Sequence, residues 1–145
     1  MNTLRGKHAG ATIWVLGSGA TLTHIDPRFF DDKIVVATNL AAHGLGVTAA
    51  ETYVHSHYHE NIGYQYEQHP DWVYVTCLGD RGFAGTPTHQ LDRVLYYPHY
   101  PTGDYEAGKG WHPDGLIVGP SSIHGSMHLA AFMGASNIIL CGADC

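Results

Sequence analysis

The sequence has few charged residues, and few of those are basic. Only 14% of its 145 residues are charged while 44% are hydrophobic, a balance that is typical of a folded protein and argues against an intrinsically disordered chain. Seven Lys and Arg against thirteen Asp and Glu give a formal net charge of -6, and the basic residues form no cluster. We therefore expect no binding to the phosphate backbone of a nucleic acid.

Long apolar runs and paired cysteines are missing as well. No stretch reaches the roughly 18 apolar residues of a membrane-spanning helix, and the N-terminus lacks a signal-peptide pattern. The three cysteines are an odd number, and Cys77 and Cys141 lie in apolar runs. We expect one cytoplasmic domain over residues 1–145, with free thiols and no membrane span. The sequence leaves open whether it forms a homo-oligomer.

Short apolar runs alternate with helical patterns along the chain. Strands are predicted at residues 12–16, 34–37, 53–55, 72–76 and 138–141, because such β-branched runs suit strands buried on both faces of a parallel sheet. Helices are predicted at 39–43, 58–69 and 121–133, the last ending at Gly134 in a left-handed C-cap. The alternation predicts an α/β fold, a Rossmann-like three-layer sandwich with a mostly parallel sheet.

One long segment breaks this regularity. Residues 79–115 are rich in Gly and Pro and contain a single apolar island at 94–97. A connection of this length without regular structure is usually functional in a compact domain. We expect the island to be a short strand and the rest to be a flap that closes over a ligand.

Small and polar residues follow the predicted strands. The turn from Gly17 to Thr21 comes after the first strand, where glycines let backbone N–H groups approach a phosphate; a tight connection is the alternative. Asn39 follows the second strand and would face the same crevice, to bond a ribose or base, unless it only caps a helix.

A pair of serines begins the third predicted helix. Ser121 and Ser122 would combine two hydroxyls with free helix N–H groups, which favours a phosphate or carboxylate, and simple capping explains one of them. The nucleotide-binding candidates are therefore Gly17, Ser18, Gly19, Thr21, Asn39, Ser121 and Ser122.

Histidine is abundant, with twelve copies. His55, His57 and His59 would share one side if the strand continued, and could bind zinc or serve an active site. His124 and His128 have the spacing of the H-E-x-x-H motif without its glutamate. We assign no metal site to either group.

Asp144 ends the last predicted strand, where a carboxylate could hold a metal, a ribose or a catalytic proton, or only shape a turn. Together with His55 and His57 it completes the set of catalytic candidates.

Taken in order, several short motifs resemble one superfamily. They are Gly17-Ser18-Gly19-Ala20-Thr21-Leu22, Asn39, Ser121-Ser122 and Ile139-Leu140-Cys141-Gly142-Ala143-Asp144. The superfamily contains the CMP-sialic-acid-dependent bacterial sialyltransferases, the Maf motility-accessory glycosyltransferases and the 6-hydroxymethylpterin pyrophosphokinase-like proteins. The resemblance covers nearly the whole chain, although each motif is short.

The resemblance implies a nucleotide-dependent transferase, most like a glycosyltransferase with a CMP-type nucleotide-sugar donor and a small-molecule acceptor. The first loop and Asn39 would then hold the nucleotide, Ser121 and Ser122 would contact the donor, and a histidine would handle the acceptor proton. Its other implication is a pterin-type pyrophosphokinase with Mg²⁺ on carboxylates such as Asp144. A non-catalytic nucleotide- or metal-binding module is the remaining alternative.

Overall fold

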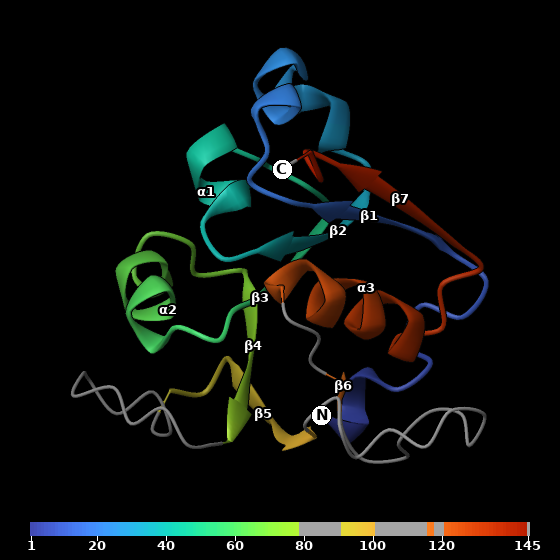
Figure 1. The fold of residues 1–145 in the computed structure, drawn as a ribbon, viewed down its shortest axis with the longest axis vertical. Helices are drawn as coiled ribbons and strands as arrows, with labels where there is room; N and C mark the ends of the chain where they lie inside the picture. The colour runs from blue at the N-terminus through green and yellow to red at the C-terminus, as the bar shows by residue number, and fades with distance from the viewer. Residues whose placement is uncertain (79–90, 101–115, 118–120, 145) are drawn as a thin grey trace.

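A computed structural model describes residues 1–78, 91–100, 116–117 and 121–144. Its strands form one seven-stranded sheet in the order β6-β5-β4-β3-β2-β1-β7, and every neighbouring pair is parallel (Figure 1). The strands are β1 (Thr12–Leu16), β2 (Ile34–Thr38), β3 (Glu51–His55), β4 (Val73–Leu78), β5 (Val94–Tyr100), β6 (Leu116–Ile117) and β7 (Asn137–Cys141).

The central strands are apolar because both of their faces are covered. Along β2, Val35 and Ala37 join a hydrophobic cluster on one face, whereas Val36 joins a second cluster on the other face. All three side chains are fully buried. A strand that is covered on both sides needs no polar alternation, which explains the continuous apolar runs in the sequence.

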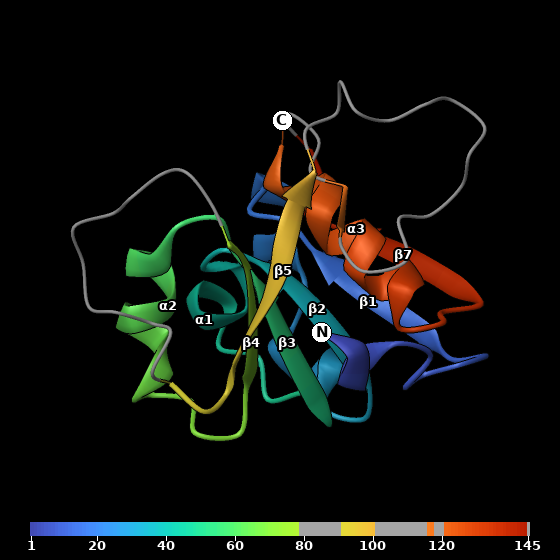
Figure 2. The ribbon, with the colours of Figure 1, turned by 90° about the horizontal axis from the view of Figure 1, so that it is seen from below.

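Helices supply the two covering layers. One face carries α1 (Ala41–Leu45), α2 (His59–Tyr66) and the 3₁₀ turns η2 (Ala20–His24) and η3 (Pro27–Phe30). The other face carries α3 (Ser122–Phe132) and η1 (Asn2–Leu4). Figure 2 shows α1 and α2 on one side of the strands and α3 on the other. The predicted α/β, Rossmann-like three-layer sandwich is therefore confirmed.

The N-terminal segment forms hydrogen bonds with the C-terminal end of α3. Backbone N–H groups of Gly6 and His8 donate to the carbonyls of Phe132 and Met133 at 3.0 and 2.8 Å. Gly134 follows the helix with φ +91°, as the predicted left-handed C-cap requires. These bonds satisfy carbonyls that an isolated helix end would leave without partners.

Several element boundaries differ from the prediction. The apolar island is a strand, as expected, but it extends from Val94 to Tyr100. The first helix begins at Ala41 rather than Asn39, because Asn39 is left-handed with φ 54°. Strand β6 and the three 3₁₀ turns were not predicted. The remainder of the expected flap, residues 79–90 and 101–115, lies outside the described residues.

Cys77 and Cys141 are free thiols, as the odd cysteine count indicated. Among the described helices, none is long and apolar enough to cross a membrane.

Candidate functional site

The carboxyl ends of β1, β2 and β3 form one edge of the sheet, and the first turns of α3 lie against it. A Cβ atom on Gly17, after β1, would come within 3.0 Å of the Ile123 side chain, and one on Gly125 would meet the His55 ring at the end of β3. The Ser126 hydroxyl reaches Thr38, the last residue of β2, at 2.7 Å. The fold thus brings the glycine turn, Asn39 and the start of α3 together.

The glycine turn packs against the segment that follows β7. The N–H groups of Gly17 and Gly19 donate to the carbonyls of Cys141 and Gly142, both at 2.8 Å. A Cβ on Gly17 would lie 2.3 Å from the Gly142 oxygen, and one on Gly19 would lie 2.3 Å from a carboxylate oxygen of Asp144. The close contact between this turn and residues 141–144 therefore requires both glycines. Two N–H groups of the turn already donate hydrogen bonds to that segment.

Asp144 is bound to this same turn. The Thr21 N–H donates to Oδ2 of Asp144 at 3.1 Å, and the Thr21 hydroxyl donates to Oδ1. These hydrogen bonds, the one from the hydroxyl first, lower the pKa of the Asp144 carboxyl. The turn therefore already faces a carboxylate of its own chain, while the neighbouring Ser18 side chain is exposed. Figure 1 shows this C-terminal end beside the turns that follow β1.

Asn39 is fixed by three hydrogen bonds. Its N–H donates to the carbonyl of His55 at 2.9 Å, its own carbonyl accepts from Gln65 Nε2 at 3.2 Å, and its Oδ1 accepts from the Ser56 hydroxyl at 2.9 Å. Asn tolerates the left-handed backbone better than most residues do. Within the described part of the chain its Nδ2 group makes no hydrogen bond, so Asn39 presents an N–H donor at this edge.

The start of α3 has no side-chain cap among the described residues. Ser121 occupies the N-cap position, but its hydroxyl makes no capping hydrogen bond. Ser121 is exposed and Ser122 is half-buried. Simple capping, the alternative explanation of one serine, therefore does not account for either hydroxyl. A helix N-terminus carries partial positive charge and suits an anion.

His55 is fully buried at the centre of a polar network. Its Nε2 lies 2.7 Å from the Tyr97 hydroxyl, and its Nδ1 lies 3.3 Å from the Ser126 hydroxyl. Burial, aided by the nearby His57, lowers the pKa of His55 to about 3. The ring is therefore neutral at physiological pH.

His57 lies beside this network and is half-buried. Its ring meets that of His55 edge to face at a centroid distance of 4.9 Å, and its Nδ1 lies 3.7 Å from Cys77 Sγ. Because β3 ends at His55, the alternating arrangement of three imidazoles does not form along one strand. No three His, Cys, Asp or Glu side chains of the described residues converge as a metal site.

The hydroxyl groups of the network around His55 were not predicted from the sequence; Tyr97 and Ser126 contact the His55 ring, and Thr38 contacts Ser126. Thr38, Tyr97 and Ser126 are all buried, and nothing in their local sequence marks them as polar partners. One signal was present: Gly125 stands inside an apolar helix, and a glycine there indicates close approach by another group. That group is the His55 ring, 2.2 Å from where a Cβ would lie.

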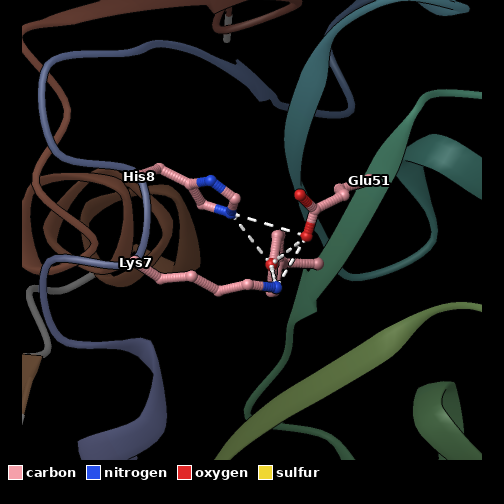
Figure 3. A network of polar contacts seen from close by, with 4 residues as sticks. Lys7, His8 and Glu51 are labelled. Atoms are coloured by element: carbon pink, nitrogen blue, oxygen red, sulfur yellow. Dashed lines mark hydrogen bonds and ion pairs between the residues drawn. The ribbon is translucent and has the colours of Figure 1, made fainter.

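A second polar cluster lies at the opposite, amino-terminal edge of the sheet. Figure 3 shows Lys7 and His8 reaching from the N-terminal loop toward Glu51 on β3. The Tyr53 hydroxyl donates to Glu51 Oε2 at 2.7 Å and lies 2.9 Å from His8 Nε2. Lys7 Nζ forms a salt bridge with Glu51 Oε2 at 2.7 Å. This cluster ties the N-terminal segment to β3, away from the edge that carries Asn39.

Comparison with known proteins identifies the fold. No protein-family model matches the chain, and no curated protein matches it. It is similar to the solved structure of the MAf glycosyltransferase from Magnetospirillum magneticum AMB-1, with a TM-score of 0.61 and 13% sequence identity over 95% of this chain. The chain spans 24% of the length of that protein. At this identity the likeness shows a shared fold.

Proposed function

We propose that this chain forms the nucleotide-binding part of a glycosyltransferase-like enzyme that takes a nucleotide-sugar donor. The observation that carries the proposal is the meeting of Asn39, the glycine turn and the uncapped start of α3 at the carboxyl edge of a parallel sheet. In open α/β sheets, ligands bind outside this edge. The fold shared with a glycosyltransferase and the sequence resemblance to CMP-dependent transferases support this class of donor.

Each polar group has a distinct role in the proposal. Asn39 Nδ2 donates to an acceptor atom of the ribose or base. The phosphate or carboxylate of the donor lies at Ser121 and Ser122, because the glycine turn already uses the N–H groups of Gly17 and Gly19 and faces the Asp144 carboxylate. Ser18 contributes its exposed hydroxyl.

We assign the proton of the acceptor hydroxyl to His57 rather than to His55. A general base must come within hydrogen-bond reach of the proton that it takes. His57 is half-buried, although its Nε2 atom is buried, whereas His55 has no exposed surface at all and both of its ring nitrogens contact protein hydroxyls. The expected effect of His57→Gln is a lower kcat with an unchanged KM for the donor.

Asn39→Asp tests the nucleotide site. The substitution keeps the shape of the side chain and an acceptor for Ser56, but it replaces the Nδ2 donor with an oxygen and adds a negative charge. We expect CMP or a CMP-sugar, at a hundred times its dissociation constant, to stabilise the wild-type protein by about 2.7 kcal/mol. The variant should bind the nucleotide at least about tenfold more weakly, because a hydrogen bond is lost and a like charge is added.

Asn137→Asp is the matched control, since it makes the same chemical change at the start of β7, on the opposite edge of the sheet. It should leave nucleotide affinity unchanged. The proposal fails if no nucleotide among CMP, UDP, ADP and their sugar conjugates stabilises the wild-type protein. Equal weakening by both substitutions would also overturn the site. Binding that requires added Mg²⁺ would favour the pyrophosphokinase alternative.

A further inference from the structure

The buried network around His55 joins the two groups that the proposed function places on the nucleotide. Thr38 immediately precedes Asn39, and its hydroxyl lies 2.7 Å from that of Ser126 on α3. The Ser126 hydroxyl in turn lies 3.3 Å from both His55 Nδ1 and the carbonyl of Ser122. The network therefore runs from the residue before Asn39 to the first turn of α3.

The hydrogen-bond roles in the network follow from its members. Burial raises the pKa of Tyr97, so that its hydroxyl keeps its proton. This hydroxyl lies 2.7 Å from His55 Nε2, and in the arrangement proposed below Tyr97 donates and Nε2 accepts. A neutral imidazole with an accepting Nε2 carries its proton on Nδ1. That N–H points toward α3, where the Ser126 hydroxyl and the backbone of Ser122 receive it.

Packing holds the ring in this orientation. His55 is stacked against the ring of Tyr97 at a centroid distance of 5.8 Å and an angle of 25°. On the other side, Gly125 brings the backbone of α3 directly onto the ring. The ring therefore cannot turn over without moving either β5 or α3.

We infer that His55 is a positioning residue: held as the neutral Nδ1–H tautomer, it fixes the first turn of α3 and the end of β2, and so sets the distance between Ser122 and Asn39. This role rests on the proposed function and differs from that of His57, because His55 touches no ligand. It requires a ligand that spans both groups, as a nucleotide with its phosphate does.

The test combines a spectroscopic measurement with binding. The ¹⁵N shifts of the His55 ring should show a protonated Nδ1 and a bare Nε2, unchanged between pH 5 and 8, whereas an isolated neutral imidazole favours the other tautomer. Observation of the Nε2–H tautomer would overturn the inference. This measurement needs no nucleotide.

The binding measurement uses Ser126→Ala and Thr38→Val, which remove hydroxyls of the network and leave the side chains of Asn39 and Ser122 unchanged. Each should weaken CMP binding at least about fivefold. Phe132→Leu, at the far end of α3, is the control for lost stability alone and should leave the affinity unchanged once the folded fraction is accounted for. Equal affinity in all of these variants would overturn the positioning role and leave the proposed function standing. Absence of nucleotide binding by the wild-type protein would overturn both.

Discussion

Gly125→Ala tests the close contact between α3 and His55. Gly125 lies inside α3, where alanine would ordinarily be the better helix former by about 0.8–1 kcal/mol. Here the added Cβ would lie 2.2 Å from His55 Cε1 and 2.6 Å from Nε2. The ring is fully buried and hydrogen-bonded at both nitrogens, so it has no free space into which to move.

The overlap should outweigh the gain in helix propensity. Forcing a methyl group into a well-packed core costs about 1–3 kcal/mol or more. After subtraction of the propensity gain, we expect the free energy of unfolding to fall by up to about 2 kcal/mol, and the melting temperature to fall by up to roughly 8 °C. Gly63→Ala in α2 is the matched control, because a Cβ added there would meet no atom within 4 Å. It should raise stability by about 0.4–1 kcal/mol.

Urea denaturation of a double-mutant cycle separates the contact from other effects. His55→Ala alone should destabilise the protein by about 2–4 kcal/mol, since it opens a cavity and leaves the Tyr97 hydroxyl without its partner. In that background the Gly125→Ala methyl enters the vacated space and should no longer be destabilising, a coupling of at least about 1 kcal/mol. The reasoning is refuted if Gly125→Ala is as favourable as Gly63→Ala, or if it costs the same in both backgrounds.

Three further predictions concern other contacts. Burial, opposed by Lys7 and aided by Glu51, raises the pKa of Tyr53 to about 12, so stability should decline as the pH rises from about 10 to about 12. Because burial also raises the pKa of Tyr74 and Tyr97, Tyr53→Phe should reduce this alkaline decline in urea midpoints without abolishing it. Asp144→Ala, which removes the acceptor, should accelerate hydrogen exchange of the Thr21 amide, and unchanged exchange would contradict the contact. Burial, and then the neighbouring His43, lower the pKa of His69, whose Nε2 lies 2.9 Å from His43 Nδ1. Because the folded protein disfavours the charged imidazole, stability should fall as the pH drops below about 6.5. The His69→Gln protein should show a flatter pH profile over that range.

The order of elements could be predicted because apolar periodicity is a local property. The runs at residues 12–16 and 34–37 are buried on both faces of the sheet, and the sequence shows this directly. Boundaries were less predictable where a single backbone torsion decides them. At Asn39 the left-handed φ of 54° delays α1 to Ala41, and hydrogen bonds from residues distant in sequence hold that conformation. Strand β6 has only two residues, too few to leave a pattern.

The candidate site was predictable only in part, for a similar reason. The rule that carboxyl ends of parallel strands share one edge correctly brought the glycine turn and Asn39 together. What the rule could not give is which polar atoms remain available. The Thr21 hydroxyl, a nucleotide-binding candidate, donates to Asp144, a catalytic candidate 123 positions later. Long-range partners of this kind leave no signal in local sequence.

The glycine turn shows why residue type alone is a weak guide to a ligand. A glycine after the first strand is expected where a phosphate approaches the backbone, and the same glycine is required where another segment does so. Here the approaching segment is residues 142–144, with a carbonyl and a carboxylate oxygen each 2.3 Å from a would-be Cβ. An anionic ligand placed at the turn would face this carboxylate, whereas one placed at Ser121 and Ser122 would face the positive end of α3. The glycine turn would therefore repel an anionic ligand, and the start of α3 would attract it. If the proposed site is correct, Ser122→Asp should abolish nucleotide binding more completely than Ser18→Asp, and the reverse order would move the phosphate to the turn.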